Sequence, residues 1–217
     1  MNTDYGSTST TLMFEGLSES YPPLDTLQGN VAKHYLEGFP DDYRAFLAAH
    51  NGGFADAFRY TFLTGVPFKS KAVSNSSRDD CPIEFFGLPQ DEQLEGYPDS
   101  LLHVAADHAQ EGFLPNDVVA IARCVQSSLV CLSRREDDFG SVYYWDWYWQ
   151  YPWCEAFFRE RINAARQPYD EPNQILGNSE HPQHTELRDA LNFATLLKVA
   201  PSFSAWAEQC EDRRDRD

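Results

Sequence analysis

The chain has 217 residues and a formal net charge of −17 at pH 7, with 34 Asp and Glu residues against 17 Lys and Arg residues. This length suits one well-filled domain, and an apolar share of 42% with 14% aromatic residues excludes a wholly disordered chain. A field of this sign repels nucleic acid and anionic membranes and attracts basic partners, although acidity can also serve only to keep a protein soluble.

Membrane and secretory signals are not found in the sequence. No apolar run approaches the roughly 20 residues of a membrane helix, and the first residues, MNTDYGSTSTT, lack the basic and apolar regions of a signal peptide. The five cysteines are odd in number, scattered and never in CxxC spacing, which argues against a disulfide framework and a zinc site. They are Cys81, Cys124, Cys131, Cys154 and Cys210. We therefore expect a cytoplasmic protein with buried, reduced thiols.

The N-terminal part of the chain predicts two helices. Residues 1–20 are polar and rich in Ser and Thr, and we expect them to be flexible. A first helix is predicted to begin near Asp25, and a second within PDDYRAFLAAHNGG, where Pro40 and two acids suit a first turn. Asn51-Gly52 suits a left-handed cap at its end. The stripe predicted to face the core is Tyr43, Phe46, Leu47 and His50.

Strands are predicted in the middle of the chain. The short runs FRYTFL and IEFFGL flank the polar connection SKAVSNSSRDDCP, whereas LLHVAADHAQ is compatible with a helix or an extended run. The runs VVAIARC, SSLVCLS and GSVYYWD follow with short polar links, so Val118–Ala122, Leu129–Ser133 and Ser141–Asp146 should be neighbouring antiparallel strands. The link RREDDFG supplies turn residues and charge.

Helices return in the C-terminal part. CEAFFRERINAARQ, ELRDALNFATLLKV and SFSAWAEQC are each predicted as a helix, and PYDEPNQILGNSEHPQHT as a loop. Residues 212–217 are predicted to be a frayed tail. The order of elements indicates an α+β fold instead of alternating βαβ units.

The stretch GSVYYWDWYWQYPW, residues 140–153, carries rings at most of its positions. A strand with one buried face needs an apolar residue only at every second position. The run is therefore either buried on both faces or partly a sticky surface.

Four segments occur in an order that resembles the SUKH superfamily, which contains fungal cell-wall regulators and bacterial proteins that neutralise toxins. They are FPDDYRAFLAAHNGG (39–53), FFGL (85–88), VVAIARC to GSVYYWD (118–146) and VAPSFSAWAEQ (199–209). The resemblance implies a single α+β domain over residues 21–211, with a central, mostly antiparallel sheet and flanking helices. It implies action by binding, without catalytic residues. The simpler family pattern lacks about residues 147–198, an inserted helical segment here, while Val142–Asp146 fits a core strand of the family.

Catalytic and metal-binding patterns are weak. The sequence contains no GxxxxGK[ST] phosphate loop, no GxSxG elbow and no HExxH helix. His181 and His184 could hold a metal but suit solvated loop positions better, and Asp107 and His108 are neighbours that seldom face one another. We expect no catalytic residue, no metal and no cofactor, although a nucleophile assembled from distant residues stays open.

Acidic clusters next to rings are the better candidates for a binding site. Most of these clusters suit solvated turns, but Glu136–Asp138 lies in a hairpin loop that leads into the aromatic strand, and aromatic anchors bind while charges steer and select. The predicted partner-binding residues are Glu136, Asp137, Asp138, Trp147, Trp149, Trp153, Asp170 and Glu171. The alternative for the rings is a second small core beneath the inserted helix.

Two functions from different classes remain. The first is an immunity protein that binds a cognate toxin, which the charge predicts to be basic, as a nuclease would be. The second is an intracellular scaffold or regulatory module with a partner that is not a toxin.

Overall fold

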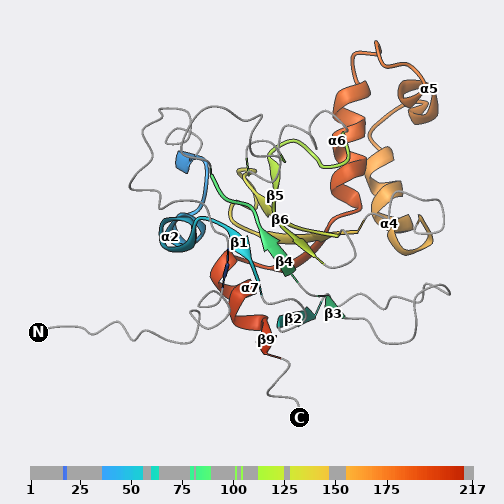
Figure 1. Cartoon of the computed structure of the whole chain (residues 1–217). Helices are drawn as coiled ribbons and strands as arrows, with labels where there is room; N and C mark the ends of the chain where they lie inside the picture. The colour runs from blue at the N-terminus through green and yellow to red at the C-terminus, as the bar shows by residue number, and fades with distance from the viewer. Residues whose placement is uncertain are drawn as a thin grey trace, which may run out of the picture.

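The computed structural model describes residues 17–18, 36–55, 60–63, 79–80, 82–88, 101, 104, 112–124, 128–146 and 155–212. Within them, a six-stranded antiparallel sheet in the order β1-β4-β5-β6-β7-β8 forms the centre of the fold (Figure 1). Its strands are β1 (Gly53–Phe54), β4 (Pro82–Phe85), β5 (Val118–Cys124), β6 (Leu129–Ser133), β7 (Val142–Trp145) and β8 (Leu197–Ala200). The helices are α2 (Asp41–His50), α4 (Glu155–Arg166), α5 (Pro172–Leu176), α6 (His184–Ala194) and α7 (Phe203–Gln209). The architecture is α+β, as predicted.

The predicted meander is confirmed. Strands β5, β6 and β7 are consecutive neighbours, with Val119 opposite Leu132 and Cys131 opposite Tyr143. Every residue of β6 and β7 is buried, as expected for strands covered on both faces. The dense rings of Tyr143, Tyr144 and Trp145 are therefore core residues, which resolves the aromatic run as far as Asp146.

Helices cover both faces of this sheet. On one face, the ring of Phe85 in β4 lies 5.4 Å from that of Phe46 in α2 and 6.1 Å from that of Trp206 in α7. The register from Phe85 through Ala122 and Val130 places Tyr144 on this same face. Tyr143 therefore faces the other side, where its ring lies 5.5 Å from Phe193 of α6. Figure 1 shows α4 and α6 side by side on that side, with α5 at their far end.

The end of α2 is locked to the segment after β4. Asn51 adopts the predicted left-handed conformation with φ of 45°, and its side chain bonds to the backbone of Leu88. Gly52 follows with φ of 81°, and a Cβ there would lie 2.6 Å from the backbone nitrogen of Gly87. Only glycine meets both demands. The HNGG and FFGL segments thus form one structural unit.

Two predictions about the C-terminal part are wrong. The helix expected to continue to Val199 ends at Ala194, and Leu197–Ala200 instead forms β8 along β7. Arg161 accounts for the early end, because its guanidinium donates to the carbonyl oxygens of Phe193 and Leu196 and so satisfies groups that another helical turn would use. The loop expected between residues 168 and 185 contains the short helix α5, with Pro172 at its first turn.

A small second sheet has the order β3-β2-β9. β2 (Tyr60–Leu63) falls within the predicted run FRYTFL, whereas β3 (Asp79–Asp80) lies in a segment predicted to be a connection. β9 (Glu211–Asp212) pairs with β2 at the end of the described chain. The helix predicted near Asp25 lies outside the described residues, as do Cys81 and Cys154. Of the other cysteines, Cys124 and Cys131 are buried free thiols, as predicted, whereas Cys210 is a free thiol that is only half-buried.

Candidate partner-binding surface

The hairpin loop, residues 134–141, joins β6 to β7 and is held from within. Asp138 accepts hydrogen bonds from the hydroxyl groups of Ser133 and Tyr143. Three backbone bonds tighten the turn: Ser133 to Ser141 at 2.9 Å, Gly140 to Ser133 at 2.9 Å and Ser141 to Asp138 at 2.9 Å. Gly140 has φ of 83°, a conformation that favours glycine. The loop is therefore an ordered platform.

The carboxylate of Asp138 stabilises this loop from the inside. It is half-buried, and its partner Tyr143 is only 4% exposed. Burial, followed by the hydrogen bond and the charge of Asp138, raises the pKa of Tyr143 well above 10.0, so the phenol remains a donor. By contrast, Glu136 and Asp137 are exposed. Of the three acids predicted in this loop, two point to solvent and one is turned inward.

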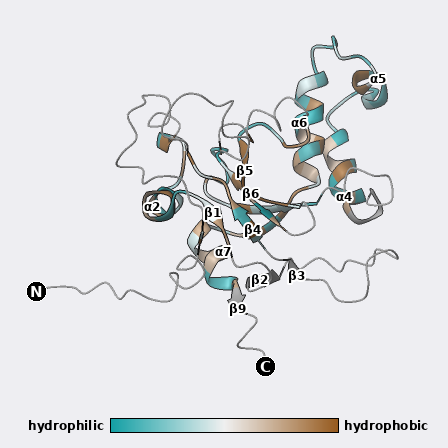
Figure 2. Ribbon diagram, in the orientation of Figure 1, coloured by the Kyte–Doolittle hydropathy of each residue, from teal (hydrophilic) through white to brown (hydrophobic). Residues whose placement is uncertain are grey.

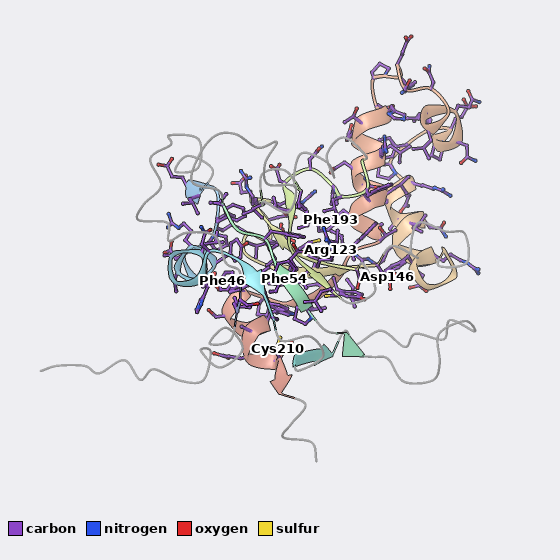
Figure 3. All side chains as sticks on the ribbon, in the orientation of Figure 1. Phe46, Phe54, Arg123, Asp146, Phe193 and Cys210 are labelled. Atoms are coloured by element: carbon purple, nitrogen blue, oxygen red, sulfur yellow. The ribbon has the colours of Figure 1, made fainter. Side chains whose placement is uncertain are left out.

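Arg135 connects the hairpin loop to α6. Its guanidinium lies 3.3 Å from the carboxylate of Asp189, 3.6 Å from that of Asp137 and 4.4 Å from the ring centre of Phe193. Asp189 also accepts a hydrogen bond from the backbone nitrogen of Asn116. Each contact alone is worth about 1 kcal/mol or less, but together they fix α6 against the loop. Figure 3 shows Phe193 near the sheet.

The far end of the helical segment is acidic. Residues 167–187 contain Asp170, Glu171, Glu180 and Glu186 but no Lys or Arg, and Figure 2 shows mostly hydrophilic residues between α5 and α6. Asp170 and Glu171 are exposed. Burial and a hydrogen bond to Glu186 raise the pKa of Tyr169. This hydrogen bond connects Tyr169, which precedes Asp170, to α6.

The predicted site residues are thus only partly brought together. Within the described residues, Asp170 and Glu171 are connected to the hairpin loop only through α6, where Glu186 and Asp189 are one turn apart. Trp147, Trp149 and Trp153 lie outside the described residues, and their role stays a prediction. Sequence reasoning missed Phe139 in the same loop, whose side chain is 50% exposed. An aromatic residue beside three acids in RREDDFG was the available signal.

Metal-ligating side chains are not grouped in the described part of the chain. Within it, no group of three or more His, Cys, Asp or Glu side chains is arranged to hold a metal ion. The Nδ1 atom of His181 accepts a hydrogen bond from the backbone nitrogen of Gln183 at 3.2 Å, a contact internal to its turn.

No helix among the described residues combines the length and apolar character needed to span a bilayer.

A comparison with protein families decides the relationship. The family model described as SMI1 / KNR4 family (SUKH-1) matches residues 36–165, more than half of the chain. The chain belongs to the SMI1/KNR4 family. The SUKH resemblance drawn from the sequence is therefore confirmed. No curated protein and no solved structure matches the chain in the corresponding searches.

The SMI1/KNR4 match also divides the candidate surface. It includes α2, β4 to β7, the hairpin loop and most of α4, but ends before α5, α6, β8 and α7. The hairpin loop is thus part of the family region, whereas α6, which Arg135 binds, lies beyond it. The predicted insertion at about 147–198 begins inside the matched range, so only its later part extends past the family region.

Proposed function

We propose that this SMI1/KNR4-family protein is an immunity protein that binds a cognate antibacterial toxin and neutralises it without covalent chemistry, protecting the producing cell. The observation that carries this proposal is the joining of the hairpin loop to α6 through Arg135 and Asp189, beside exposed acids. Such a surface is stiff and negatively charged, which suits fast recognition of a basic protein.

The mechanism of neutralisation is occlusion. A toxin whose active site attracts phosphate groups, such as a nuclease, presents Lys and Arg side chains around that site. Carboxylates at Glu136 and Asp137 can pair with such cations and exclude the anionic substrate from them. The proposed contact surface also includes Asp138 as the loop's support, the acids Asp170 and Glu171, and the rings of Trp147, Trp149 and Trp153.

Rescue from toxicity tests this function. The chain is co-expressed with the product of each neighbouring gene that arrests growth when expressed alone, and growth is compared with that toxic product alone. An immunity protein restores growth, and a scaffold or regulatory module leaves the cells dying. Growth that stays arrested despite soluble, folded chain would refute the proposal.

Two charge reversals locate the interaction. Glu136→Lys in the hairpin loop and Glu208→Lys on α7 change the net charge by the same amount, and both positions are exposed. Only Glu136→Lys should weaken toxin binding and slow association, which electrostatic steering can raise to about 10⁸–10⁹ M⁻¹s⁻¹ at low salt. Equal effects of both variants would show that overall charge acts, and not this loop.

A further inference from the structure

Phe139 occupies an unusual position for a large apolar side chain. It is 50% exposed, and among the residues whose side-chain burial the structure describes, the other exposed large hydrophobic residue is Phe54, at 40%. Single exposed rings are common on protein surfaces and need no explanation alone. Phe139 differs from such rings in the loop that carries it and in the charges around it.

The backbone on both sides of Phe139 is fixed. Asp138 before it is anchored by Ser133 and Tyr143, and Gly140 after it donates to the carbonyl oxygen of Ser133 at 2.9 Å. A Cβ on Gly140 would lie 3.1 Å from Cγ of Pro40, so the loop also lies against the start of α2. A ring presented on such a loop loses little conformational entropy on binding.

Acidic residues lie in the hairpin loop and in the segments that contact its backbone. Glu136 and Asp137 are exposed in the same loop, and Asp41 follows Pro40 with a side chain 90% exposed. Asp117 is exposed as well, and its carbonyl oxygen accepts from the backbone nitrogen of Arg134 at 2.6 Å. Asp41 is paired with Arg44 of its own helix, so the acids of the loop itself carry most of the charge argument.

The two arginines of the loop are outnumbered by its three acids, and Arg135 is shared between the carboxylates of Asp189 and Asp137. The guanidinium of Arg134 lies 5.5 Å from the ring centre of Phe39, and that of Arg135 lies 4.4 Å from the ring centre of Phe193. Both side chains are half-buried. The loop therefore keeps a net negative charge, and its exposed charged side chains are those of Glu136 and Asp137.

We propose that Phe139 is the apolar anchor of this surface, and that it inserts into an apolar pocket bordered by Lys and Arg side chains on a basic protein. The inference rests on the proposed function for the partner's identity as a toxin. Interfaces of this kind combine one desolvated aromatic side chain with a polar rim that excludes water and selects the partner. Nucleic acids and anionic lipids are disfavoured as occupants, because the net negative charge of the loop and of the whole chain would repel their phosphates.

Phe54 supplies a matched control. It is the same residue type with similar exposure, but it lies on β1, at the opposite end of the sheet order from the β7 side (Figure 3). Phe139→Ala and Phe54→Ala each remove one exposed ring, so both variants should remain folded, with melting temperatures close to that of the unmodified chain.

The test measures binding to the toxic gene product identified by the co-expression experiment, purified in an inactive form. Calorimetric titration should show at least about 30-fold weaker affinity for Phe139→Ala. Phe54→Ala should stay within about threefold of the unmodified chain. The loss should arise mainly from faster dissociation, since the steering charges remain.

Each outcome decides the question. Tight binding by both the unmodified chain and Phe139→Ala overturns the anchor and leaves the immunity function standing. If the unmodified chain does not bind the toxic gene product, the proposed function fails. The surface is then tested in cells by photo-cross-linking, with p-benzoylphenylalanine placed at position 139 or 54 of the full chain. A basic protein cross-linked only from position 139, which then binds Phe139→Ala at least about 30-fold more weakly in purified form, supports the anchor. Any other cross-linking result overturns it.

Discussion

Asn51 binds both backbone groups of Leu88 through the two ends of its side-chain amide. Its Nδ2 donates to the carbonyl oxygen of Leu88 at 2.9 Å, and its Oδ1 accepts from the backbone nitrogen at 2.8 Å. Asn51 is 1% exposed and has φ of 45°. Asn51 thereby ends α2 and also bonds the backbone after β4 in the way that a neighbouring strand would.

Asn51→Ala should destabilise the protein by about 2–4 kcal/mol, because it leaves the buried N–H and C=O groups of Leu88 without this partner and places alanine in a left-handed conformation. Asn51→Gly removes the same hydrogen bonds but tolerates the backbone, so it should be less harmful. The difference between the variants, measured by urea denaturation, isolates the conformational part. If both variants lose little stability, the amide does not support the fold.

The two neighbouring acids of the hairpin loop should respond differently to neutralisation. Asp138→Asn removes the charged acceptor of Ser133 and Tyr143 and should cost about 1–3 kcal/mol. Asp137→Asn should stay within about 0.5 kcal/mol, since that side chain is 72% exposed. Thermal unfolding of the two variants makes the comparison. Equal losses would contradict the inward role of Asp138.

Arg135 and Asp189 should be energetically coupled. A double-mutant cycle with Arg135→Met and Asp189→Asn should give a coupling of about 0.5–1 kcal/mol, because both side chains are half-buried and well placed. Asp189→Asn keeps an acceptor for the backbone nitrogen of Asn116, so that bond does not enter the cycle. Additive effects of the two substitutions would mean that the pair does not hold α6 to the hairpin loop.

Stability should depend on pH through His50. Burial lowers the pKa of His50 below its ordinary value of 6.5, and its ring stacks on Phe46 at 5.6 Å between centres. The unfolded chain therefore binds the proton more tightly, so this contribution to stability rises with pH from the lowered pKa up to about 6.5 and is constant above it.

His50→Gln should flatten this part of the curve. The free energy of unfolding is measured for both proteins from about pH 5 to pH 8, and the difference between them removes the titration of the other groups. The unmodified chain should lose stability relative to the variant as the pH falls below about 6.5. Parallel curves would contradict the assignment.

Local sequence patterns were enough to predict most of the strands and helices. The runs forming β5, β6 and β7 are separated only by short links, so periodicity and turn residues identify them. β8 was not predictable in this way, because Leu197–Ala200 becomes a strand only by pairing with β7 across the whole helical segment. A helical pattern before it extended naturally over Leu196 and Leu197, and tertiary pairing overrode it.

The candidate surface was harder to predict than the fold. The sequence alone does not distinguish the three acids Glu136, Asp137 and Asp138. Only the structure shows that Asp138 supports the loop while the other two are exposed. Phe139 was overlooked because an aromatic residue usually indicates core, whereas this loop presents it to solvent. The link between Arg135 and Asp189 joins residues far apart in the chain, which no local pattern reveals.

The pairing of Tyr144 with Leu197 has a consequence for how such proteins can diversify. The chain leaves β7 and returns on β8 at adjacent points, so α4, α5 and α6 form a cassette whose two ends meet at neighbouring strands. The entropy of closing such an excursion rises by only about 0.6 kcal/mol for each doubling of its length. Exchange of the cassette for a shorter or longer one, in evolution or by grafting, would therefore change the surface beside the sheet without changing the strand pairing.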